Sequence, residues 1–100
     1  KAAAPSAGSI GYQERNKLRN RIQALARECD RLLTEQEKLG QEILLLTKKM
    51  DEPAVYSDPG KIGKVMAEKE AKEAAKAASE EAWFAKSEEL EELKKGNGFV

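Results

Sequence analysis

Two groups of basic side chains are the residues of this chain best suited to chemistry with a partner. The first group, between residues 15 and 31, consists of Arg15, Lys17, Arg19, Arg21, Arg27 and Arg31. The second group, between residues 61 and 76, consists of Lys61, Lys64, Lys69, Lys72 and Lys76. Lysine and arginine neutralise backbone phosphates, which gives binding that is independent of sequence and weakened by salt. The residues that we expect to contact DNA or RNA are Arg15, Lys17, Arg19, Arg27, Lys61, Lys64, Lys69 and Lys72.

An acidic segment near the end of the chain offers a structural explanation for the first group. The whole chain has a net charge of zero, with 18 basic and 18 acidic residues. Residues 1–31 hold four more basic than acidic residues, whereas residues 80–93 hold five more acidic than basic ones. If these segments lie side by side, the cations would form ion pairs along a coiled coil instead of binding phosphate. Both interpretations stay open at this point.

Residue types suited to catalysis or metal binding are scarce. The sequence has no histidine, and its single cysteine, Cys29, has no partner for a disulfide or a thiol metal site. We interpret Cys29 as a small apolar core residue, because no base is placed to activate its thiol. There is no glycine-rich phosphate loop, and the glutamates of residues 80–92 are typical of a solvated helix face. We therefore expect no enzymatic activity, no cofactor and no metal in this chain.

The aromatic side chains have two possible roles. Tyr12, Tyr56, Trp83 and Phe84 could stack on nucleic-acid bases. We favour a structural role, in which Tyr56 and Val55 cap a hairpin tip and Trp83 fills a helix seam opposite Cys29.

The elements that must position these residues are two long helices. Charged residues make up 36% of the chain and aromatic residues 5%, so apolar side chains must act along a narrow seam. Over residues 12–50 this seam advances in alternating steps of four and three, as in a coiled coil. Its members are Leu18, Ile22, Leu25, Cys29, Leu32, Gln36, Leu39, Ile43, Leu46 and Met50. Leu44 and Leu45 fall off the seam, and we expect them to pack on the tip loop or to form a small exposed patch.

A connection over residues 51–58 separates the two helices. Pro53 cannot continue the first helix, because it lacks an N–H and clashes with the preceding turn. Asp58 followed by Pro59 predicts a helix start, since the aspartate can accept a hydrogen bond from a free N–H and proline suits the first helical position. The second helix should run over residues 59–95, and the glycines at 96 and 98 should end it.

Alanine is the predicted seam of the second helix. The stripe consists of Ala71, Ala75, Ala78 and Ala82, with Ile62, Val65 and Met66 at one end and Leu90 and Leu93 at the other. A short connection favours antiparallel neighbours. In an antiparallel hairpin, the numbers of two residues that face each other have a constant sum, and the position of the turn sets this sum at about 112. Leu18 and Ile22 would then meet Leu90 and Leu93, Cys29 would lie near Trp83, and Gln36 would lie near Ala75 and Lys76.

The sequence thus predicts an all-α fold, in which two long helices form an antiparallel coiled-coil hairpin. We expect a flexible linker over residues 1–11, leading in from an upstream part of a longer protein, the hairpin over 12–95 and a flexible tail over 96–100. We also expect a monomer, because the two stripes complement each other within one chain.

Three segments resemble the C-terminal domain of ABC-F ATPases, in particular the Uup-like branch. Residues 50–59 read Met-Asp-Glu-Pro-Ala-Val-Tyr-Ser-Asp-Pro and resemble the hairpin tip of that domain. Residues 11–15, Gly-Tyr-Gln-Glu-Arg, resemble its entry. Residues 82–91, which begin Ala-Trp-Phe, resemble its closing segment.

The resemblance implies an accessory domain. It implies that ATP and Mg²⁺ are bound by upstream ATPase domains of the same chain, and that this hairpin binds nucleic acid without sequence preference, DNA in particular. The ribosome and its RNA are further partners in that family. A cytoplasmic location without membrane contact is the matching expectation.

A second class of function stays open, namely a purely structural or protein-contact hairpin. Similar hairpins occur in the C-terminal arm of valyl-tRNA synthetases and in the N-terminal domain of class-II release factors. Salt-dependent binding to DNA or RNA would distinguish the two classes.

Overall fold

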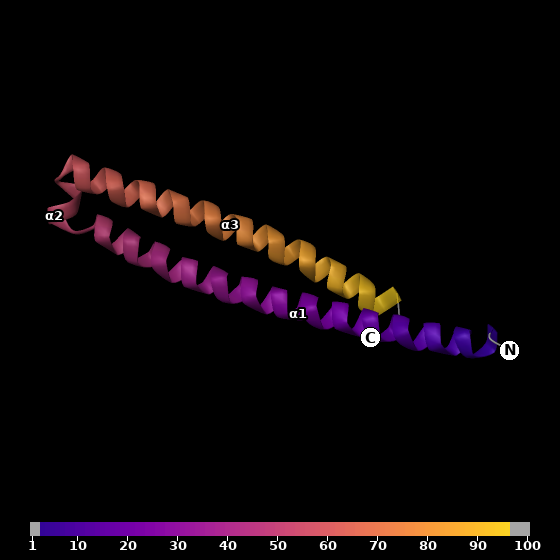
Figure 1. Cartoon of the computed structure of the whole chain (residues 1–100). Coiled ribbons are helices and arrows are strands. Elements are labelled where there is room, and N and C mark those ends of the chain that lie inside the picture. The colour runs from indigo at the N-terminus through magenta and orange to yellow at the C-terminus, as the bar shows by residue number, and fades with distance from the viewer. Residues whose placement is uncertain (1–2, 97–100) are drawn as a thin grey trace.

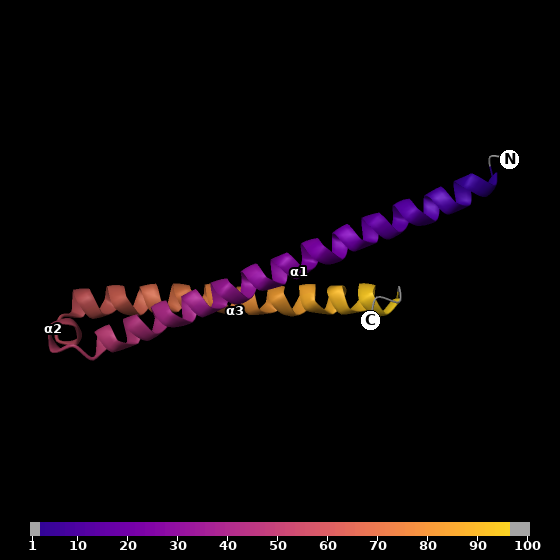
Figure 2. The same ribbon diagram turned by 90° about the horizontal axis from the view of Figure 1, so that it is seen from below.

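The chain folds into a long antiparallel helical hairpin (Figure 1). The computed structural model describes the backbone of residues 3–96 and the side chains of residues 12–95. Its elements are α1 (Ala3–Met50), the short α2 (Pro53–Tyr56) and α3 (Pro59–Gly96). The molecule measures 82 × 21 × 14 Å along its principal axes, and α1 crosses α3 at a shallow angle (Figure 2). The predicted all-α hairpin is confirmed.

Helix α1 begins earlier than the sequence indicates. Residues 3–11 were expected in a flexible linker, but α1 starts at Ala3. Pro5 lies in the first turn, where the backbone N–H groups have no helical partner, so its missing N–H costs no hydrogen bond. The remainder of the predicted linker, residues 1–2, and the tail residues 97–100 lie outside the described part of the chain. Because α3 ends at Gly96, the first turns of α1 project beyond it (Figure 1).

The predicted seam of α1 faces α3. Its residues Leu25, Cys29, Leu32 and Leu46 are buried, and its other members from Leu18 to Met50 are half-buried. The Cys29 thiol lies 3.7 Å from the hydroxyl of Ser87. Ser87 is one helical turn further along α3 than Trp83, the residue predicted to lie near Cys29. Trp83 itself is half-buried on the seam of α3.

A small apolar cluster closes the tip. Leu46, Val55 and Val65 are buried together, and Met50 and Ile62 pack against them. Val55 is delivered by α2, which begins at Pro53. Tyr56 is 58% exposed and is not a member of this cluster, so of the two residues predicted to cap the tip, Val55 is the one that is buried in it.

The N-cap of α3 is formed as predicted. The Asp58 carboxylate accepts hydrogen bonds from the backbone N–H groups of Gly60 (2.9 Å) and Lys61 (3.3 Å). Pro59 occupies the first helical position. This cap fixes where α3 begins and therefore the register of everything that follows.

The predicted seam of α3 is correct at its two ends, where Ile62, Val65, Leu90 and Leu93 face α1, but its alanine stripe and Met66 are wrong. Ala71, Ala75 and Ala78 are exposed, and only Ala82 is half-buried. The residues that face α1 are Ile62, Val65, Lys69, Lys72, Lys76, Ser79, Trp83, Lys86, Leu90 and Leu93. The apolar residues at the two ends of α3 are in phase with these lysines, whereas the alanines lie one position earlier. Lysine can occupy a seam because its methylene stem covers apolar surface while its ammonium reaches the edge.

A ladder of polar contacts fixes the register of the two helices. Glu28 pairs with Lys86 at 2.9 Å, and Glu42 pairs with Lys72 at 3.0 Å. Midway between them, the Ser79 hydroxyl lies 3.2 Å from the Glu35 carboxylate. The residue numbers sum to 114 in each rung, close to the predicted 112, and successive rungs are seven residues apart. A register slip would break all three rungs at once, so the ladder specifies alignment more than it adds stability.

Ser79 is the one buried polar side chain among the described residues, and its polar groups have partners. Its hydroxyl lies 3.2 Å from the backbone oxygen of Leu32, and its own backbone oxygen accepts a hydrogen bond from the Gln36 amide at 3.2 Å. Gln36 thus contacts α3 one turn beyond the predicted Ala75. This polar layer divides the seam into two apolar halves.

Candidate nucleic-acid interface

The face of α1 that points away from α3 carries more basic than acidic side chains. Because the seam fixes the rotation of α1, the outward positions from residue 13 to residue 48 are determined. They are Gln13, Lys17, Asn20, Ala24, Arg27, Arg31, Thr34, Lys38, Gln41, Leu45 and Lys48, and all of them are exposed. We call this set the outer stripe. It holds five cations and no carboxylate.

The acidic residues of α1 lie outside the outer stripe. Glu28 and Glu42 face the seam lysines of α3, and Glu35 faces Ser79. Asp30 and Glu37 lie on the flank between the outer stripe and the seam. Lysines inside the seam thus hold two of the carboxylates of α1, Glu28 and Glu42, at the interhelical edge.

The ladder also affects the acidity of one carboxyl group. The ammonium of Lys86, which donates a hydrogen bond to the Glu28 carboxylate, holds the pKa of Glu28 below its ordinary value of 4.5. Arg31 and Arg21 act in the same direction from a greater distance. The lowered pKa means that the Glu28–Lys86 ion pair persists to a more acidic pH than an isolated glutamate would allow.

The structure separates the predicted residues of the first basic group. Lys17 and Arg27 lie on the outer stripe, as does Arg31. Arg15 and Arg19 point towards the seam side of α1, near the level where α3 ends. No ion pair joins Arg15, Lys17, Arg19 or Arg27 to another described residue. The cation of this group that pairs with the acidic end of α3 is Arg21, through Glu89.

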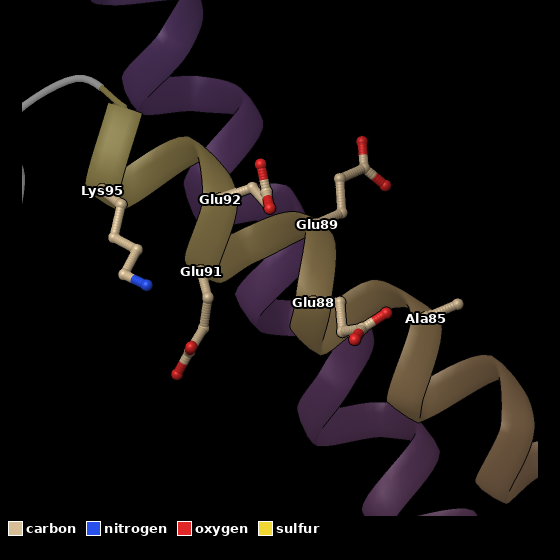
Figure 3. A pocket seen from close by; sticks show the side chains of 6 residues that line it. All are labelled: Ala85, Glu88, Glu89, Glu91, Glu92 and Lys95. Atoms are coloured by element: carbon tan, nitrogen blue, oxygen red, sulfur yellow. The ribbon is translucent and has the colours of Figure 1, made fainter.

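The acidic end of α3 is therefore only partly neutralised by α1. Glu88, Glu89, Glu91 and Glu92 line a shallow groove with Ala85 and Lys95, and their carboxylates fan out from the helix (Figure 3). Among the described residues, no group of three or more acidic, cysteine or histidine side chains is arranged to hold a metal ion. The expected neutralisation of Arg15, Arg19 and Arg27 by this segment is not found in the described part of the chain.

The second basic group divides in the same way. Lys61 and Lys64 are exposed, and neither forms an ion pair with another described residue. Lys69, Lys72 and Lys76 are half-buried on the seam and pair with Glu73 (3.8 Å), Glu42 (3.0 Å) and Glu80 (3.0 Å). Of these three pairs, Lys72–Glu42 joins α3 to α1, whereas the other two lie within α3.

Sequence reasoning missed Lys38 and Lys48. Both lysines are separated in the sequence from the two basic groups. They join the other cations only along the outer face of the helix. The periodic signal was available, because the correctly predicted seam of α1 already defines the opposite face. The exposed aromatic residues Tyr12, Tyr56 and Phe84 lie on three different helices, with Tyr12 and Tyr56 at opposite ends of the rod, so the fold does not assemble a stacking platform from them.

Comparison of the chain with protein-family models, with curated proteins and with solved structures found no match. Within the described residues, no helix is both long and apolar enough to pass through a membrane.

Proposed function

We propose that this hairpin binds the phosphate backbone of nucleic acid, without sequence preference, through the outer stripe of α1. The observation that supports this proposal is the set of five exposed cations on the outer stripe, Lys17, Arg27, Arg31, Lys38 and Lys48, which outnumber the two carboxylates of the adjoining outward row, Asp30 and Glu37. A solvated coiled-coil face normally mixes both signs of charge. A face with an excess of positive charge instead attracts a polyanion.

The dimensions of the stripe set its affinity. From Lys17 to Lys48 it extends about 46 Å, at about 1.5 Å per residue. Five phosphate contacts at most would give a salt slope of about −4.5 on duplex DNA, and a neutral chain adds no long-range attraction. We therefore expect micromolar or weaker affinity that falls steeply with salt and is indifferent to base sequence.

The wider context of the hairpin is part of the same proposal. The tip sequence at residues 50–59 and the aromatic closing segment support an accessory domain of an ABC-F type ATPase. In that setting, ATP and Mg²⁺ belong to upstream domains, and this hairpin supplies contact with DNA or ribosomal RNA in the cytoplasm. The chain itself performs no catalysis.

A matched pair of double variants tests which basic surface binds. Arg27→Gln/Arg31→Gln removes two cations from the outer stripe, and Lys61→Gln/Lys64→Gln removes two exposed cations near the tip. Binding of labelled DNA and RNA duplexes and single strands is measured by fluorescence anisotropy at several salt concentrations. We expect the outer-stripe variant to weaken binding at least about tenfold and to reduce the slope of log affinity against log salt concentration by about two. The tip variant should weaken binding less.

Three other outcomes would change the conclusion. A larger loss in the tip variant would move the interface to Lys61 and Lys64. Strong dependence on base sequence would contradict a backbone-only contact. Absence of binding at low salt to every probe would reject nucleic-acid binding by this hairpin and favour a protein-contact role.

A further inference from the structure

Four of the exposed large apolar side chains lie on one side of the hairpin. Gly40 of α1 and Glu73, Ala77 and Glu80 of α3 line the same groove, which identifies the positions that share this side. Leu33 and Leu44 lie seven residues before and four residues after Gly40, on the same stripe of α1. Met66 and Phe84 lie seven residues before Glu73 and seven after Ala77 on α3. Their exposed fractions are 44% for Leu33, 56% for Leu44, 48% for Met66 and 59% for Phe84.

The centre of this side is hollow. The groove has a volume of about 430 Å³, and Ile43 and Lys76 complete its lining. Gly40 has no side chain, and a Cβ built there would first meet the Cε of Lys76 at 3.6 Å. Small residues at Gly40 and Ala77 allow another helix to approach closely at this point. The side therefore combines a low centre with apolar residues towards both ends.

The four apolar residues are arranged symmetrically. The midpoint of Leu33 and Leu44 lies between residues 38 and 39 of α1, and the midpoint of Met66 and Phe84 is residue 75 of α3. The ladder pairs residues whose numbers sum to 114, so these two midpoints lie at the same level of the rod. A two-fold axis through that level would place Leu33 of one copy opposite Leu44 of the other. It would likewise place Met66 opposite Phe84. Such self-complementarity is the requirement for an isologous interface between identical chains.

We propose that two copies of this chain associate in antiparallel orientation through this face, which we call the dyad face. Leu33 of one copy packs on Leu44 of the other, and Met66 packs on Phe84, with Gly40 and Ala77 near the axis. The product is a four-helix bundle whose new core runs beside the two existing seams. The proposal does not rest on nucleic-acid binding, and it goes beyond the monomer expected from the seam alone.

The surface of the hairpin is large enough for this association. The chain exposes 7437 Å², whereas a compact monomer of 11.1 kDa exposes about 5,700 Å². The difference of roughly 1,700 Å² reflects the extended shape of the rod, whose long side can supply the area of about 800 Å² that each partner buries in a standard interface. The lysines on this side are paired within the chain, Lys69 with Glu73 and Lys76 with Glu80. Two carboxylates on this side, Glu37 and Glu70, form no ion pair with another described residue. The two-fold axis places Glu37 opposite Gly40 and Glu70 opposite Glu80 of the second copy, so added salt should strengthen the dimer by screening the repulsion between carboxylates.

Adjacent leucines provide a matched test by sedimentation equilibrium. Leu44 belongs to the dyad face, whereas Leu45 is 65% exposed and lines a different groove with Glu42 and Glu68. We expect the unmodified chain to approach twice its 11.1 kDa mass as the concentration rises from micromolar to millimolar. Leu44→Glu should raise the dimer dissociation constant at least about 100-fold, because each dimer contains the substitution twice. Leu45→Glu should leave it unchanged, and circular dichroism checks that both variants stay helical.

Disulfide trapping tests the antiparallel arrangement directly, in a Cys29→Ala background. Leu33→Cys and Leu44→Cys should give a covalent dimer when the two variants are mixed and oxidised, but neither should do so alone. A parallel pair would place α1 of one copy over α3 of the other and would give no crosslink between these positions, so absence of the mixed crosslink in a dimer of confirmed mass, or crosslinking within a single variant, would overturn the geometry. A mass of 11.1 kDa up to about 1 mM, or equal effects of Leu44→Glu and Leu45→Glu, would overturn the dimer and assign this face to a different partner.

Discussion

Lysine side chains inside the seam of α3 determine much of the chemistry of this surface. A seam lysine must place its ammonium at the interhelical edge, and it is stabilised there by a carboxylate from the facing helix. Lys72 and Lys86 meet Glu42 and Glu28 in this way. The contacts are partly exposed and individually weak. Their main consequence is the distribution of charge, because they hold Glu28 and Glu42 at the interhelical edge and keep these two acids off the outer stripe.

The titration of Glu28 measures one of these contacts. Its pKa is lowered by Lys86, so the ion pair contributes stability above the ordinary pKa of 4.5 and loses it as the pH falls through the lowered value. We expect NMR titration to show Glu28 with a pKa below 4.5, and Lys86→Gln to bring it back towards 4.5. An unchanged Glu28 titration in Lys86→Gln would show that the pair does not form in solution.

Leu25 is the most buried side chain of the seam, with 2% of its surface exposed. Leu25→Ala should lower the free energy of unfolding by about 2–4 kcal/mol, because it removes buried methyl groups and leaves a cavity. Leu45→Ala, at an exposed outer position, should lower it by less than about 0.5 kcal/mol. Urea denaturation followed by circular dichroism gives both values. Equal losses would mean that the rotation of α1 is wrong.

At the scale of elements, the seam of α1 and both helix boundaries at the tip were predictable from the sequence, whereas the middle of the α3 seam was not. Leucine and isoleucine mark the α1 seam clearly, and proline and aspartate mark the tip. In α3 the hydropathy pattern favours the alanines as the seam, although each alanine can bury little surface. From the sequence, the lysines that occupy the seam would be predicted to be solvent-exposed. Alternating steps of three and four residues lead from Ile62 and Val65 through the lysines to Leu90 and Leu93. Following these steps would have identified the residues that face α1. The same reasoning explains why the outer stripe was found only in part.

Neighbouring positions of α3 test this assignment. Lys72→Glu would place a carboxylate against Glu42 at a half-buried site, and we expect a loss of about 1–2 kcal/mol in the free energy of unfolding. Ala75→Glu adds the same charge at an exposed position and should change stability by less than about 0.5 kcal/mol. Thermal and urea unfolding at neutral pH compare the two variants. If Ala75→Glu were the more damaging change, alanine would form the seam after all.

At the scale of the whole molecule, the two backs of the hairpin differ in character. The back of α1 is the basic outer stripe, whereas α3 exposes alanines along its middle and glutamates towards its end. A neutral chain with this distribution has a preferred orientation near a polyanion, with α1 facing it. In the proposed dimer, α1 of one copy lies over α1 of the other, so both outer stripes would face the same side.

The hairpin also has a mechanical consequence that follows from where its long helices begin and end. Ala3 and Gly96 both lie at the end of the rod opposite the tip (Figure 1). A force that separates these two ends acts across the seam, so it loads one layer of contacts at a time instead of all layers together. The layers around Leu90 would open first, the Ser79 layer next and the apolar cluster around Val55 last. The two helices would therefore separate at low force when Ala3 and Gly96 are pulled apart. A force applied from the side would instead be resisted by both helices together, because they are packed along their length.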